Sequence, residues 1–165
     1  PYIRFCVGLT VALDCSSASG DYLNLGNLST SEAKFGTSQM AAFTNDESGY
    51  LISLFGTTMT SGNNAIPALA SPQPSIPGTS QFGINLKDNV SPNVGQEADG
   101  IGTGTPQPGY DGANFYKFNQ GDIIASSSIP TESSRYTVSY IVNSSASQPP
   151  GIYSTTVTYV ASATF

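Results

Sequence analysis

Several stretches of the sequence alternate apolar and polar residues with a period of two, which restricts most of the chain to extended segments. They cover residues 3–13, 34–44, 50–54, 79–86, 114–118, 135–143 and 153–165. Successive side chains of a strand point to opposite faces, so the pattern predicts strands with one face in a core and one in water. Only 29–33 has the residues for a single helical turn.

The alternation also predicts which side chains point inward. The inward sets are Phe35, Thr37, Gln39, Ala41 and Phe43; Tyr50, Ile52 and Leu54; Phe82, Ile84 and Leu86; Tyr136, Val138, Tyr140 and Val142; and Tyr153, Thr155, Val157, Tyr159, Ala161, Ala163 and Phe165. The opposite face of the last stretch carries almost only Ser and Thr, and we expect all of these strands to be half-buried in antiparallel sheets with the polar side to water.

Gly- and Pro-rich turns separate the predicted strands, and 91–112 is a long Gly/Pro-rich loop. About eight strands joined in this way favour a single all-β domain over residues 1–165. We expect a two-sheet antiparallel β-sandwich, immunoglobulin-like or jelly-roll in type, with a closed barrel as the alternative.

The charge of the chain argues against several classes of partner. The net charge is −6, and the five basic residues are Arg4, Lys34, Lys87, Lys117 and Arg135, which lie far apart. Nucleic acid and anionic membrane surfaces are therefore not expected partners. No apolar run is long enough for membrane insertion of this segment, and an opening Pro1 is typical of a trimmed product.

The two cysteines, Cys6 and Cys15, predict one disulfide in an oxidising compartment. An uninterrupted strand from residue 3 to residue 13 would hold them roughly 30 Å apart, whereas a disulfide needs Cα atoms about 5.5 Å apart. We therefore expect the chain to fold back near Gly8, because glycine supplies the backbone freedom. Two buried free thiols are the alternative.

Catalytic and metal-binding patterns are not recognisable. The chain has no His, so Ser or Cys nucleophiles lack their usual base, and no motif surrounds the lysines. Glu97, Asp99 and Asp111 share one loop region and suit solvated acids better than a glycosidase pair or, with Asn114, a calcium site. We predict no enzyme activity, no cofactor and no metal.

Two kinds of covalent modification involve asparagine side chains. Lys34, Lys87 and Lys117 lie in or beside predicted strands, and the asparagines available to them are Asn85, Asn114, Asn119 and Asn143, so a Lys–Asn isopeptide bond is an alternative to ordinary solvent-facing lysines. Asn27, Asn89 and Asn143 begin N-x-S/T sequences, which are glycosylated only in a suitable host.

Three parts of the chain carry a resemblance to a known group. They are Phe5-Cys-Val-Gly with Asp14-Cys-Ser-Ser, Gln81-Phe-Gly-Ile-Asn-Leu, and the tail at 136–143 and 150–165. Together they resemble secreted surface proteins of candidate-phylum bacteria, with a C-terminal pattern similar to pilin-type and WxL-type domains. The WxL motif itself is missing because the chain has no Trp. The resemblance implies an extracellular, cell-surface location and a sandwich fold.

The long alternation at both ends of the chain favours a structural role. A terminal strand with one apolar face suits strand addition between subunits, and Ile3, Phe5, Val7, Leu9 and Val11 are the candidate subunit interface. We therefore predict self-association into a homopolymer, as a pilus-like filament or a surface layer. The alternative is an adhesin or a module for cell-surface glycan, in which Tyr110 and Tyr116 stack on sugar rings; a place in the core or at a sheet edge suits these two residues equally well.

Overall fold

The computed structural model describes residues 1–164, and all regular structure within them is β-structure. These residues form fifteen strands and no helix, so the all-β prediction is confirmed. Phe165, predicted as the last inward residue, lies outside the described residues. Within residues 1–164 there is also no helix long and apolar enough to cross a membrane.

The larger sheet has five strands, and β14 lies at its centre. Its strands are β1 (Ile3–Gly8), β4 (Lys34–Thr44), β14 (Thr131–Asn143), β8 (Gln81–Asn85) and β11 (Asp99–Gly100). One edge of β14 pairs with β4 along most of its length, and the other pairs with β8 and, further down, with β11. All these pairings are antiparallel, and β1 forms the free end of the sheet beside β4.

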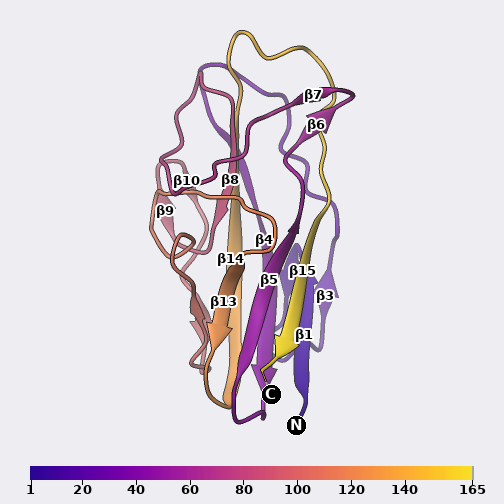
Figure 1. Cartoon of the computed structure of the whole chain (residues 1–165), viewed down its shortest axis with the longest axis vertical. Helices are drawn as coiled ribbons and strands as arrows, with labels where there is room; N and C mark the ends of the chain where they lie inside the picture. The colour runs from indigo at the N-terminus through magenta and orange to yellow at the C-terminus, as the bar shows by residue number, and fades with distance from the viewer. Residues whose placement is uncertain (165) are drawn as a thin grey trace.

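The second sheet has four antiparallel strands, ordered β12 (Thr105–Pro106), β13 (Ile123–Ser127), β5 (Tyr50–Gly56) and β15 (Val157–Ala163). In Figure 1 it lies in front of the larger sheet, with β1 and β15 on the same side of the molecule. Neither sheet closes on itself in the described strand order, so the closed-barrel alternative is not adopted. Three small hairpins complete the fold: β2 (Thr10–Val11) with β3 (Ala18–Ser19), β6 (Thr60–Ser61) with β7 (Asn64–Ala65), and β9 (Asn89–Val90) with β10 (Asn93–Val94).

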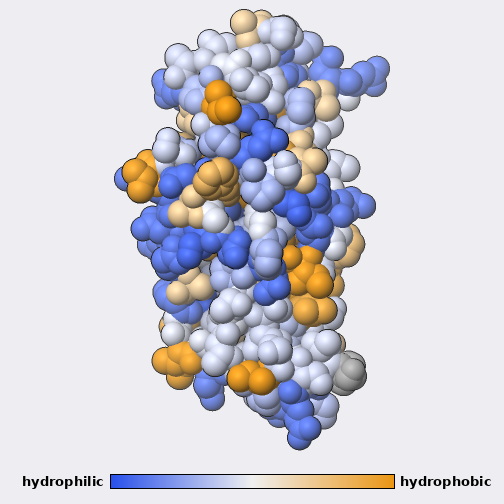
Figure 2. All heavy atoms as spheres, turned by 60° about the vertical axis from the view of Figure 1, so that its left-hand side comes forward, coloured by the Kyte–Doolittle hydropathy of each residue, from blue (hydrophilic) through white to orange (hydrophobic). Residues whose placement is uncertain are grey.

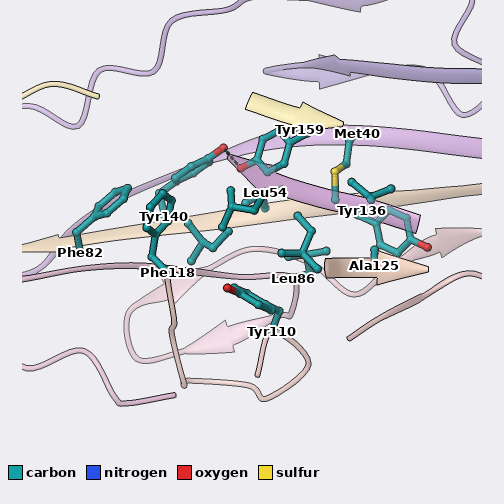
Figure 3. Close-up of a cluster of buried hydrophobic side chains, with 14 of the residues drawn as sticks. Met40, Leu54, Phe82, Leu86, Tyr110, Phe118, Ala125, Tyr136, Tyr140 and Tyr159 are labelled. Carbon is teal, nitrogen blue, oxygen red and sulfur yellow. Dashed lines mark hydrogen bonds between the residues drawn. The ribbon is translucent and has the colours of Figure 1, made fainter. Parts of the chain in front are cut away.

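Both larger sheets contribute side chains to one hydrophobic cluster (Figure 3). The larger sheet supplies Met40, Ala42, Phe82, Ile84, Tyr136, Val138, Tyr140 and Val142, and the smaller sheet supplies Tyr50, Ile52, Leu54, Ile124, Ala125 and Tyr159. Burying one large side chain of this kind stabilises the fold by roughly 1.5–3 kcal/mol. The inward sets predicted for 50–54, 79–86 and 135–143 are confirmed.

The inward face predicted for β4 was wrong. Met40 and Ala42 point into the core, while Phe35 is 45% exposed. The prediction assumed that Phe35 and Phe43, the two aromatic residues of the strand, point into the core. Phe43 instead packs against other residues on the face of β4 opposite the core. The ring of Tyr2 packs edge-on against Phe43 with centroids 5.4 Å apart, and the Arg4 guanidinium lies 5.1 Å from the centre of that ring. Because both faces of β4 are partly covered, alternation alone did not identify its core side.

The stretch 3–13 is not one strand, because the chain turns away after Gly8 as the cysteine spacing predicted. The Leu9 amide donates to the Ser19 carbonyl at 2.8 Å, and the β2–β3 hairpin follows. A Cβ atom on Gly8 would lie 3.0 Å from the Ser19 backbone, so this close approach favours glycine. Val11 of this hairpin is buried, with 4% of its surface exposed.

Two further predictions differ from the structure. Residues 114–118 form only isolated bridges, from Tyr116 to Gln73 and from Lys117 to Ile84, instead of a strand. β13 was not predicted, because Ile123-Ile124-Ala125 is a short apolar run without alternation. The loop 91–112 contains β11, β12 and one strand of the β9–β10 hairpin, each only two residues long.

Candidate functional site: the sheet edges and the groove above them

The cysteines are joined in a disulfide that fastens the β2–β3 hairpin to β1. The Cα atoms of Cys6 and Cys15 lie 5.7 Å apart, and no cysteine of the chain is free, so the predicted disulfide is confirmed. The Arg4 guanidinium donates to the Asp14 carbonyl at 3.1 Å beside it. β1 is therefore held in place by its pairing with β4 and by the disulfide to the β2–β3 hairpin that follows it.

The predicted interface residues do not share one accessible face. Ile3 and Phe5 pack partly buried against the core cluster, and Leu9 is half-buried. Val11 is buried, whereas Val7 is 41% exposed. Of the five residues, Val7 alone presents a largely open side chain, and the interface on β1 stays a prediction.

The four ends of the two larger sheets differ in how they are protected. Proteins usually blunt an edge strand by shortness, charge, proline or a covering segment. β11 and β12 have two residues each, and Pro106 ends β12. β1 carries Arg4 and the disulfide. β15 has seven residues with no charge, proline or glycine, so its sequence has none of these protective features.

A groove of about 860 Å³ opens above β1 and β15, between residues 20–28 and residues 148–157. Three polar side chains line its floor, each more than nine-tenths buried: Ser38, Tyr140 and Tyr159. The Ser38 and Tyr140 hydroxyls are 2.9 Å apart, and those of Tyr140 and Tyr159 are 2.5 Å apart, as the dashed line in Figure 3 marks. Burial raises the pKa of both tyrosines above the ordinary value of 10.0, so both hydroxyls keep their protons well above neutral pH.

The two walls of the groove have different chemistry. On one wall, Asp21, Tyr22, Asn24 and Asn27 are exposed, and Tyr22 is 75% exposed. Leucines at positions 23, 25 and 28 point from the same segment toward the core. The other wall holds Pro149, Pro150, Ile152 and the ring of Tyr153, whose hydroxyl donates to the Pro149 carbonyl at 2.7 Å. This groove was not predicted from the sequence, because its walls come from two segments that lie far apart in the chain and show no alternation.

The three acids of the long loop are held by separate partners. Glu97 pairs with Lys87, Asp99 pairs with Arg135 at 2.6 Å, and Asp111 accepts the Gly109 amide at 3.2 Å. Burial is the largest single influence on the pKa of Glu97 and acts to raise it, but the hydrogen bonds from Lys87 and the Asp88 amide, with the charge of Lys87, together outweigh burial and lower the pKa. Asn114 accepts the amides of Val90 and Ser91. Within residues 1–164, no group of three or more His, Cys, Asp or Glu side chains could hold a metal ion.

The lysines and the glycosylation sequences also have defined surroundings. Lys34 pairs with Glu32 at 3.1 Å, Lys87 with Glu97, and Lys117 with Asp122 at 2.6 Å, so each lysine contacts a carboxylate. Of the three sequon asparagines, Asn89 is 1% exposed and Asn143 is 0% exposed, while Asn27 lies open on the groove wall. Asn27 is thus the accessible sequon asparagine.

The two tyrosines for which sugar stacking and a core position were alternatives are both fully buried, so the core position holds and stacking on a sugar does not. Tyr110 and Tyr116 are 0% exposed. The Tyr110 hydroxyl donates to Asp122 at 2.8 Å, and the Lys117 ammonium lies 5.3 Å from the centre of the Tyr110 ring. Both serve the core.

On the side of the molecule shown in Figure 2, hydrophobic residues form small separate groups among hydrophilic and neutral ones. Among the large hydrophobic residues exposed in the described part of the chain are Val90, Ile101 and Ile129. Isolated apolar residues of this kind are normal on a monomer surface. This side therefore offers no continuous apolar interface.

Comparisons of the chain with models of protein families, with curated protein sequences and with solved structures gave no match.

Proposed function

We propose that the chain is a structural subunit of an extracellular filament or cell-surface layer, assembled by strand addition between copies. We further propose that its two larger sheets form a two-layer β-sandwich of immunoglobulin-like or jelly-roll type. The shared core cluster of the two sheets supports this description of the fold. A sandwich of this type has strand edges at which another copy can add a strand. Assembly by strand addition therefore requires an edge strand that is free to pair.

The observation that carries the proposal is the edge of β15, which pairs with no further strand and carries no charge, proline or glycine, with β1 of the other sheet beside it. The strand pairs with β5 through residues 157–163 on one side and is the terminal strand of its sheet on the other. All seven residues are uncharged, and the first four, at 157–160, have good strand propensity, so the strand can act as a template for another strand. Long open edges of this composition promote pairing with a second chain.

The charge of the molecule favours a second copy at this edge. Two copies of net charge −6 repel each other, so they meet most readily where neither carries an acid. β15 has no charged residue, and its Val160 is 42% exposed beside the edge. β1 lies on the same side of the molecule, so Val7 and the rest of β1 can extend the contact (Figure 1).

Light scattering over a range of concentrations, with negatively stained micrographs, tests the proposal. We expect the wild type to form assemblies whose mass grows with concentration. Val160→Lys should abolish them, because lysine at an edge opposes pairing. Val90→Lys is the matched control, since Val90 is 82% exposed on the distant β9–β10 hairpin.

Each outcome is informative. A wild type that remains monomeric at every concentration contradicts the proposal. Dimers that do not grow, and that Val160→Lys dissociates, would support strand addition but contradict the filament or layer. Equal assembly by the two lysine variants would exclude β15 as the interface.

A further inference from the structure

We infer that the groove between residues 20–28 and 148–157 is a binding site for a neutral oligosaccharide. This function is separate from assembly, since the inference rests on groove residues and does not require β15 to pair with another copy. The volume of about 860 Å³ falls within the roughly 300–1,000 Å³ of small-ligand sites. The site therefore has room for several sugar rings.

The floor of the groove is lined by three hydroxyls that interact with one another. Hydrogen bonds join Ser38 to Tyr140 and Tyr140 to Tyr159, and Ser38 also interacts with the Tyr159 hydroxyl. A hydroxyl oxygen has two lone pairs, so each of the three keeps acceptor capacity beyond the bonds within the group. The floor therefore favours a ligand hydroxyl that donates a hydrogen bond to it.

The walls fit the two faces of a sugar. The exposed groups of Asp21, Asn24 and Asn27 offer carboxylate and amide partners for ring hydroxyls, and the Asn24 carbonyl oxygen alone is already used, by the Gly26 amide at 2.8 Å. The facing wall of Pro149, Pro150 and Tyr153 is apolar and suits the C–H face of a ring. Tyr22, at 75% exposure, is free to stack at the mouth.

The charge and backbone of the groove disfavour other ligand classes. Among its lining residues Asp21 is the one carboxylate, and none is a lysine or arginine, so phosphates and polyanions lack a partner. A peptide strand would need an open backbone ladder along a wall. One wall turns at Gly26, where φ is 76°, and the other already pairs Ser154 with Thr60. A polar but uncharged ring is the better fit.

Titration of the folded protein with neutral hexasaccharides tests this inference. The probes are the β-1,4-glucose, β-1,3-glucose, β-1,4-mannose and N-acetylglucosamine oligomers. Binding is monitored through the chemical shifts of the backbone amides at low protein concentration. We expect at least one probe to shift amides of 20–28 and 148–157. Tyr22→Ala should weaken that binding roughly tenfold, because one stacking contact is lost.

Tyr2→Ala is the matched control, because Tyr2 is 52% exposed and does not line the groove. It should leave the affinity unchanged. The inference is overturned if no probe shifts any groove amide at millimolar concentration, if the shifts lie elsewhere, or if the two alanine variants bind alike. Binding of an extended uncharged peptide in the groove in place of every sugar would also overturn it. Because assembly is not the readout, none of these results depends on the filament proposal.

Discussion

The hydroxyls of Tyr50 and Tyr136 lie 2.8 Å apart and join the two larger sheets across the core. Tyr50 begins β5 and Tyr136 lies on β14, and both side chains are 0% exposed. Burial raises the pKa of each, so both remain protonated and able to hydrogen-bond. A polar pair in this position fixes the offset between the sheets, because neither hydroxyl has water as an alternative partner.

Removing one hydroxyl of this pair should therefore destabilise the protein by about 1–2 kcal/mol, since the other is left buried with fewer partners. We expect Tyr50→Phe and Tyr136→Phe each to lower the midpoint of urea unfolding. The double variant should lose less than the sum of the two, because a pair of apolar groups leaves no orphan hydroxyl. Strict additivity would show that the two hydroxyls do not interact.

The backbone beside this pair leaves no room for a side chain. A Cβ atom on Gly104 would collide with the hydroxyls of Tyr50 and Tyr136. Gly104→Ala should cost about 1–3 kcal/mol, because overpacking forces the rings or the loop to move. At Gly112 the nearest atom to an added Cβ is 3.7 Å away, so Gly112→Ala is the control and should be near neutral. Equal unfolding free energies of the two variants would contradict the tight fit at Gly104.

Alternation located most of the longer strands. β4, β5, β14 and much of β15 lie where the period of two placed them. It did not identify the core side of β4, because both faces of that strand are partly covered, and it missed β13, because the run that begins at Ile123 has no alternation to detect. The disulfide was found because the spacing of Cys6 and Cys15 conflicts with a straight strand.

The candidate sites were harder to find in the sequence. An edge strand and a central strand can have the same alternation, so the open edge of β15 becomes visible only with the strand order. The groove depends on tertiary contact between segments more than a hundred residues apart, 20–28 and 148–157. The sequence left Tyr110 and Tyr116 with two alternatives, a surface role and a core position, and the fold buries both.

Loss of the disulfide should destabilise the fold mainly through the unfolded state. The bridge closes a short loop, with a sequence separation of 9 between Cys6 and Cys15. Loop-closure entropy for such a length corresponds to about 2–3 kcal/mol. We expect the double variant Cys6→Ala/Cys15→Ala to unfold at lower urea by that amount. Reduced wild type should approach the same stability, and the oxidised protein should be two hydrogen atoms lighter by intact mass. An unchanged urea midpoint after reduction would contradict this account.

Buried tyrosines should make the protein unfold in alkali. Six have a pKa raised above the ordinary value of 10.0, with burial as the first cause: Tyr50, Tyr110, Tyr116, Tyr136, Tyr140 and Tyr159. The unfolded chain releases these protons above about pH 10 while the folded chain keeps them, so their stabilisation is complete below pH 10 and is lost as the pH rises. Each contributes about 1.4 kcal/mol per pH unit, so six can remove a typical 5–15 kcal/mol of stability within one to two units. Phenolate absorbance should therefore rise together with the loss of the β signal in circular dichroism. Release of these six protons from a chain that keeps its native dichroism would show that the tyrosines are accessible in the folded state.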